Sequence, residues 1–169
     1  MKHLIILRGP AGVGKTTTGK LLRKTLGNSL LFNIDMVCSD LIGGHPRKTT
    51  NRNAAYNLCL IAAKKKPEYN LIFERLFIDQ DDVDRVIKLF SKIKSKAKLK
   101  VSIFTLTASL AKLKKQDSKR PGVLGHENIK RLHGYFINSN VKNPGKVIGV
   151  RNKSPKRIVK DIISELGIK

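Results

Sequence analysis

The chain has 169 residues, of which 35 are Lys or Arg and 12 are Asp or Glu, so its formal net charge is +23 at pH 7. This length favours one domain with a substantial core, and the lack of a long apolar run argues against a membrane-spanning helix. The positive charge suits a polyanion such as RNA or DNA as a possible partner. A lysine-rich composition without such a partner is the alternative.

Targeting and redox features point to a cytoplasmic protein. Met1 is followed almost directly by the apolar run 3–7, so we expect no signal peptide. Cys38 and Cys59 are too few for a disulfide framework and lack the spacing of metal ligands. We therefore expect both thiols to be reduced.

The first predicted elements are a strand at 3–7 and a helix at 17–26 that ends at Gly27. Segment 9–16 between them reads G-x-x-x-x-G-K-T. Such glycines let backbone N–H groups turn toward phosphates, while the lysine reaches the β- and γ-phosphates and the threonine hydroxyl ligates Mg²⁺. The order of strand, loop and helix predicts a phosphate site, and a glycine turn without a ligand is the alternative. The residues expected to bind nucleotide here are Gly9, Ala11, Gly12, Val13, Gly14, Lys15, Thr16 and Thr17.

The remaining sequence alternates strands and helices. Further strands are predicted at 29–34, 70–73, 99–106 and 146–150. Helices are predicted at 35–41, 53–65, 79–93, 108–116, 127–137 and 155–166, with Thr107 capping the helix at 108 and Ser154 and Pro155 starting the last. This pattern predicts an α/β fold in which one domain, 1–169, has a five-stranded parallel sheet.

Asp35 is the candidate catalytic base. It follows the second strand, where the topology of a parallel sheet places it beside the phosphate loop at the carboxyl edge. A carboxylate there orients an acceptor hydroxyl and takes its proton during phosphoryl transfer. The alternative is an aspartate that only caps the following helix.

Three further residues are candidates for the metal and the acceptor. Glu74 ends the third strand and is expected, with Thr16, to hold Mg²⁺; Arg75 is expected to contact a phosphate of substrate or product. A buried ion pair between these two neighbours is the alternative. Arg52 lies in a basic loop at 47–52 and is a candidate substrate contact.

A mobile lid is predicted at about 112–126, since the loop at 117–125 contains Pro121 and Gly122. Arg120 in this loop is a candidate catalytic residue that neutralises charge on the transferring phosphate; a solvated charge run is the alternative. Arg151 and Pro155 follow the fifth strand, where a nucleobase is expected to lodge.

Motifs of other phosphate-loop proteins are missing. Segment 152–155 reads N-K-S-P, with Pro155 in place of the aspartate of a guanine-reading N-K-x-D element. No apolar run ends in an Asp-Glu pair, as it does in hydrolytic ATPases. A kinase is therefore the expected class.

The chain resembles the small P-loop kinases, in particular the group of polynucleotide 5′-kinases, zeta toxins and chloramphenicol phosphotransferases. The matching segments are 9–16, 31–35 (LFNID), 116–120 (QDSKR) and 151–166. The resemblance implies a P-loop three-layer α/β/α fold with Lys15 and Thr16 on phosphates and Mg²⁺, Asp35 as general base and Arg120 in the lid. Ile34, Met36 and Val37 depart from it, because those kinases usually carry polar or basic residues beside the catalytic aspartate.

We therefore expect an ATP-dependent kinase that uses Mg²⁺ and transfers the γ-phosphoryl group to a hydroxyl, with a nucleic acid 5′-hydroxyl as the preferred acceptor. Two alternatives remain at this point. One is a kinase of small metabolites, nucleosides or antibiotics. The other is a nucleic-acid-binding module that uses nucleotide as a switch and transfers nothing.

Overall fold

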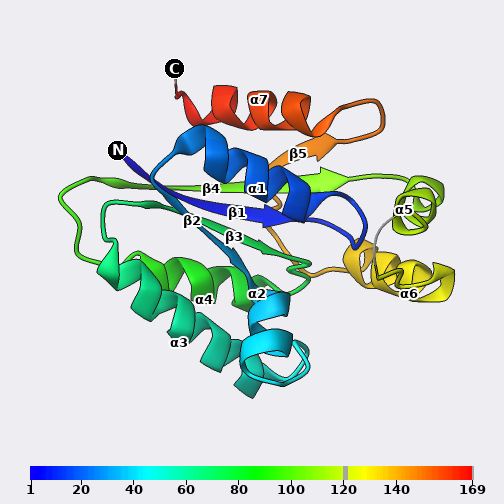
Figure 1. The fold of residues 1–169 in the computed structure, drawn as a ribbon, viewed down its shortest axis with the longest axis horizontal. Helices are drawn as coiled ribbons and strands as arrows, with labels where there is room; N and C mark the ends of the chain where they lie inside the picture. Colours follow the sequence, from blue (N-terminus) through cyan, green and yellow to red (C-terminus); the bar gives the residue numbers. More distant parts are fainter. Residues whose placement is uncertain (120–121, 169) are drawn as a thin grey trace.

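The computed structural model describes residues 1–119 and 122–168 and contains one five-stranded sheet (Figure 1). Its strands are β1 (Lys2–Arg8), β2 (Ser29–Asn33), β3 (Asn70–Arg75), β4 (Leu99–Thr107) and β5 (Lys146–Gly149). All pairings are parallel and the spatial order is β2-β3-β1-β4-β5. The predicted five-stranded parallel sheet is confirmed.

Helices cover both faces of this sheet, so the predicted three-layer α/β/α arrangement is also confirmed (Figure 1). α1 (Lys15–Leu26) and α7 (Pro155–Leu166) pack together on one face, and α3 (Thr49–Lys65) and α4 (Gln80–Phe90) cover the other. The short α2 (Ile34–Met36) continues into a π-helical turn, η1 (Val37–Leu41), and α5 (Leu110–Asp117) and α6 (His126–Ile137) lie near the carboxyl ends of the strands.

Strand β1 forms the centre of the core, and all seven of its residues are buried. Its side chains alternate between the two layers, as the pleat of a strand requires. Ile5 and Leu7 join a cluster with α1 and α7, whereas Leu4 and Ile6 join a cluster with α3 and α4. A strand that is buried on both faces explains the continuous apolar run at the start of the sequence.

Several helix boundaries differ from the sequence predictions, and three of these differences concern predicted loops, caps or core positions. α3 begins at Thr49, so most of the segment 47–52 is helical and the predicted basic loop is wrong there. α5 is capped by Ser109, whose side chain accepts a hydrogen bond from Lys112 N; Thr107, the predicted cap, is instead the last residue of β4. α4 ends at Phe90, and Ile93 packs against the same core from beyond the helix.

The last helix starts as predicted. The Ser154 side chain accepts a hydrogen bond from Arg157 N, and Pro155 occupies the first turn of α7. Within residues 1–119 and 122–168, no helix is long and apolar enough to span a membrane.

Candidate active site

The loop at 9–16 joins β1 to α1 in the conformation that its glycines permit. Gly9 has φ +152°, and a Cβ atom there would lie 2.5 Å from Leu106 O, so only glycine fits this close approach. Gly14 is the N-cap of α1 with φ 95°, and the first N–H groups of that helix face the loop. Lys15 Nζ donates to Gly9 O at 2.8 Å and to Pro10 O at 3.0 Å. The loop therefore offers a cationic side chain and a helix N-terminus to one anion.

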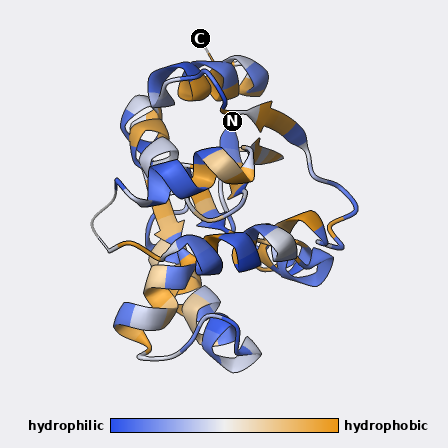
Figure 2. Ribbon diagram, turned by 90° about the vertical axis from the view of Figure 1, so that its right-hand side faces the viewer, coloured by the Kyte–Doolittle hydropathy of each residue, from blue (hydrophilic) through white to orange (hydrophobic). Residues whose placement is uncertain are grey.

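The register of the sheet brings the predicted site residues at the ends of β1, β2 and β3 to one edge of the sheet. Figure 2 views the molecule from this edge. Arg8 at the end of β1 pairs with Arg75 at the end of β3, and Glu74 of β3 pairs with Asn33 at the end of β2. Asp35 follows two residues later in α2. The phosphate loop, Asp35 and Glu74 thus leave neighbouring strands at the same end, as the order β2-β3-β1 requires.

Glu74 is almost completely buried at this edge, with 1% of its surface exposed. Its Oε1 accepts a hydrogen bond from Asn33 Nδ2 at 2.5 Å, whereas Oε2 is buried without a partner at hydrogen-bond distance. Burial raises the pKa of Glu74; the charge of Lys15 and the nearby Thr16 and Asn33 side chains oppose this rise. A buried carboxylate oxygen without a partner, close to a threonine hydroxyl, fits a site for Mg²⁺ or one of its water ligands.

Asp35 belongs to a network of four charged side chains. Its Oδ1 accepts a hydrogen bond from Arg75 Nε at 3.1 Å, and its side chain is 47% exposed. Arg75 Nη1 donates to Asp82 Oδ2, and Arg52 Nε donates to Asp82 Oδ1 at 3.1 Å. Burial lowers the pKa of Arg75, but the carboxylates of Asp35 and Asp82 outweigh it and raise that pKa overall.

Each arginine of this network is already held by protein groups. Arg75 Nη2 donates to Pro46 O at 3.3 Å; Arg52 Nη1 donates to Pro46 O at 3.3 Å and to Arg47 O at 2.5 Å. Arg75 forms its ion pairs with Asp35 and Asp82 and not with its chain neighbour Glu74. The alternative of an ion pair between Glu74 and Arg75 is therefore wrong. Two arginines and two aspartates balance in charge, so the network is neutral overall.

A cavity of about 100 Å³ lies beside the start of α1. Pro155 lines it, whereas Arg151 is exposed outside it. Lys112 Nζ donates to Val150 O at 2.6 Å and to Arg151 O at 2.5 Å, which fixes the turn before α7 against α5. The other lining residues are Val13, Gly14, Thr17, Thr18, Gln116, Val150, Lys153 and Ile158.

Sequence reasoning missed two polar groups in this cavity. Gln116 Oε1 and Thr18 Oγ1 are buried without a hydrogen-bond partner. Both therefore have unused hydrogen-bonding capacity toward a bound molecule. Gln116 begins the segment 116–120 on which the family resemblance rests, but neither residue type at a helical position indicates a contact with a ligand.

The segment of the predicted lid, at about 112–126, covers most of α5, the connection that follows it and the first residue of α6. Residues 112–117 belong to α5, and 126 begins α6. The carboxylate of Asp117 is buried and accepts hydrogen bonds from Leu124 N and Gly125 N at 3.2 and 3.0 Å. Arg120 lies outside the described residues.

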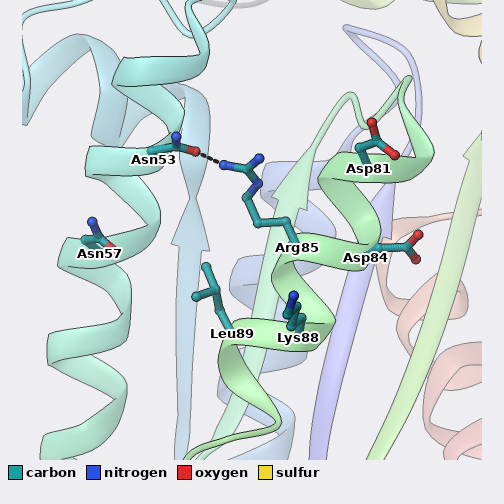
Figure 3. A pocket seen from close by; sticks show the side chains of 7 residues that line it. All are labelled: Asn53, Asn57, Asp81, Asp84, Arg85, Lys88 and Leu89. Atoms are coloured by element: carbon teal, nitrogen blue, oxygen red, sulfur yellow. Dashed lines mark hydrogen bonds between the residues drawn. The ribbon is translucent and has the colours of Figure 1, made fainter.

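A second depression, of about 630 Å³, lies between α3 and α4 (Figure 3). Arg85 Nη1 donates to Asn53 Oδ1 across it. It is lined by Asn53, Asn57, Asp81, Asp84, Arg85, Lys88 and Leu89, and none of these is a predicted site residue. This groove is therefore separate from the phosphate loop.

Comparison with solved structures places the fold among P-loop kinases. A sugar kinase from Janibacter sp. HTCC2649 is 16% identical with a TM-score of 0.71, covering 99% of this chain and 95% of that one. A gluconokinase from Sinorhizobium meliloti 1021 is 12% identical with a TM-score of 0.68, covering 98% and 91%.

A chain of the Pnkp1/Rnl/Hen1 RNA repair complex is 15% identical with a TM-score of 0.63, and the match covers 86% of this chain but 47% of that one. No protein-family model and no curated protein sequence matches the chain. These likenesses show the fold of small P-loop kinases, which the sequence motifs predicted.

Proposed function

We propose that this protein is an ATP-dependent kinase that transfers the γ-phosphoryl group to a hydroxyl held beside Asp35. The observation that carries the proposal is the meeting of the phosphate loop, the buried Glu74 and the half-exposed Asp35 at one edge of the sheet. The kinase fold of its structural neighbours supports the same class.

Each group has a role in this proposal. Lys15 and the N-terminus of α1 would hold the β- and γ-phosphates, and Thr16 and Glu74 would hold Mg²⁺, which would supply charge neutralisation. Asp35 accepts the proton of the attacking hydroxyl through the part of its carboxylate that Arg75 leaves accessible. The cavity at Pro155 receives the nucleobase, and Arg120 is proposed to act on the transferring phosphate.

The acceptor favoured by the geometry is a small uncharged compound with hydroxyl groups. Arg52 and Arg75 donate to carboxylates and carbonyls of the protein, so their charges are already compensated. An anionic acceptor would have to compete with Asp82 for these guanidinium groups. A neighbour named as a sugar kinase agrees with a small uncharged acceptor.

A nucleic acid 5′-hydroxyl is the second candidate, and the net charge of +23 is the observation that favours it. One neighbour belongs to an RNA repair complex, which also agrees with this acceptor. A panel of sugars, nucleosides, antibiotics and 5′-hydroxyl oligonucleotides, incubated with γ-labelled ATP, distinguishes the two candidates by the labelled product.

Asp35→Asn tests the proposed base. We expect phosphoryl transfer to fall by at least about a hundredfold, as for loss of a general base, while ATP affinity measured by calorimetry stays unchanged. Asp40→Asn is the matched control, since Asp40 lies on the adjoining turn η1 and is exposed. Equal activity of the two variants would overturn the role of Asp35.

A further inference from the structure

The segment that joins α4 to β4 presents a row of lysines. Residues 91–100 read SKIKSKAKLK, and the lysines at every second position are exposed while the residues between them are half-buried. The segment turns at 91–92 and bends at 93 and 96–97 before β4 begins at Leu99, and its lysines are exposed throughout. The lysine row consists of Lys92, Lys94, Lys96, Lys98 and Lys100.

The lysine row lies at the amino edge of the sheet, opposite the phosphate loop (Figure 1). Lys98 O accepts a hydrogen bond from Lys2 N at 3.0 Å, which joins the row to the start of β1. Strand β3, whose far end carries Glu74, has six residues and therefore spans roughly 20 Å. A ligand on the row would leave Asp35 uncovered.

A second group of lysines adjoins the row. Glu68 accepts hydrogen bonds from Ser95 Oγ and Lys96 N, both at 2.9 Å, and so ties the row to the turn after α3. The exposed residues Lys64, Lys65 and Lys66 immediately precede this turn. Glu68 thus joins the segment that carries the row to the segment that carries Lys64, Lys65 and Lys66.

Local structure accounts for only part of this charge. Lys64 and Lys65 lie in the last turn of α3, where cations stabilise the helix end, and Lys100 Nζ donates to Leu166 O at 3.3 Å. Lys92, Lys94, Lys96 and Lys98 lie outside helices, and no ion pair to them is found in the described part of the chain. Their mutual repulsion favours an external polyanion.

Two features select the kind of polyanion. The residues between the lysines are half-buried, and Ile93 and Leu99 among them pack against the core, which limits the apolar surface that the row could insert into a bilayer. Tyr69, next to Glu68, has a half-buried ring with Lys66 Nζ 5.6 Å from its centroid. An aromatic ring beside a line of cations is the combination that binds single-stranded nucleic acid.

We propose that the lysine row and Tyr69 form a binding surface for the phosphodiester backbone of a single-stranded nucleic acid, separate from the kinase site. Lysine ammonium groups replace the counterions of successive phosphates, and the tyrosine ring stacks on a base. The surface is independent of the proposed kinase reaction, because it involves neither ATP nor Asp35.

The test measures binding of a fluorescein-labelled oligouridylate of about twenty nucleotides by anisotropy, without ATP or Mg²⁺, over a range of salt. Each lysine contact contributes about −0.7 to the slope of log affinity against log salt. K92S/K94S/K96S/K98S should therefore flatten the slope by about 2.8. The control K20S/K130S/K156S/K160S removes the same charge from exposed positions on α1, α6 and α7 and should change the slope by less than about one.

Equal slopes for the two quadruple variants would overturn the proposal, because the charge would then act without a defined site. Loss of phosphatidylserine-vesicle binding with unchanged oligouridylate binding in the row variant would also overturn it, in favour of a membrane surface. Tyr69→Ala should weaken oligouridylate binding roughly tenfold with an unchanged slope, and Tyr69→Phe should retain it. Unchanged affinity of Tyr69→Ala would remove the stacking role and with it the preference for a single strand.

Discussion

The substitution Asp82→Asn tests the charged network under the proposed acceptor site. Asp82 is 5% exposed and holds two arginines, Arg52 at 3.1 Å and Arg75 through its other oxygen. Removing one partner of a buried ion pair costs about 3–5 kcal/mol. Arg75 keeps Asp35 as a partner and the asparagine still accepts one hydrogen bond, so we expect a loss near the lower bound, about 3 kcal/mol.

A loss of this size is measurable without abolishing the fold, since domains are stable by roughly 5–15 kcal/mol. It corresponds to a decrease in Tm of about 6–12 °C for a chain of this length. Urea unfolding followed by circular dichroism gives the free energy of unfolding, and Asp81→Asn is the matched control because Asp81 is the exposed neighbour on α4. The control should cost no more than about 1 kcal/mol.

A double-mutant cycle with Arg52→Gln completes the test. If Asp82 and Arg52 form the pair seen here, the coupling energy should be about 1–3 kcal/mol. A loss for Asp82→Asn no greater than that for Asp81→Asn, or a coupling energy near zero, would refute the reasoning.

Three further predictions follow from single side chains. Gly9→Ala places a Cβ 2.5 Å from Leu106 O at a positive φ and should lower the free energy of unfolding by about 2 kcal/mol, whereas Gly134→Ala, with open space within α6, should raise it by about 0.5–1 kcal/mol. Burial raises the pKa of Glu74 above its ordinary value of 4.5. At pH values above 4.5 the folded state therefore binds more protons than the unfolded state, and the free energy of unfolding falls as the pH rises. In metal-free buffer, the stability of Glu74→Gln relative to the parent should therefore increase from pH 4 to pH 7 in urea titrations, and a decrease would contradict the assignment. Burial raises the pKa of Cys59 to about 12; its reaction with a thiol reagent at pH 8 should be slower by at least about a hundredfold in the native protein than in urea, and equal rates would show that the thiol is accessible.

The positions of Asp35 and Glu74 were predictable because the order of strands in a parallel sheet decides which loops meet. Each residue follows a strand that is visible as a short apolar run, and the carboxyl ends of parallel strands share one edge. No knowledge of side-chain packing was needed for this step. Chain topology therefore sufficed to bring the candidate base and the candidate metal ligand together.

The partners of Asp82 were not predictable in the same way. Its carboxylate meets arginines from α3 and from the end of β3, 30 and 7 residues away in the chain. In the sequence it reads as one of four polar residues that begin α4. Only the packing of α3 against α4 decides which of these acids turns inward.

The wrong cap of α5 has a similar cause. Thr107 is as suitable an N-cap as Ser109 by residue type. Pairing of β4 with β5 uses the backbone of Thr107, which accepts a hydrogen bond from Val150 N at 2.9 Å. This long-range pairing extends the strand and delays the helix by two residues, a competition that local sequence does not reveal.

The buried Arg8, which directly precedes the phosphate loop, contacts residues from two other parts of the chain. Its guanidinium donates to Phe77 O at 3.1 Å and to Ser139 Oγ at 3.0 Å, and it lies 5.1 Å from the ring centroid of Phe136. Arg8 therefore contacts both the segment that follows β3 and the carboxyl end of α6. Amide hydrogen exchange at Arg8 should accordingly require global unfolding of the domain, whereas exchange in the segment 43–48, which lies outside helices and strands and is mostly exposed, requires only local opening. A nucleotide that binds this loop would stabilise the whole domain rather than one segment of it.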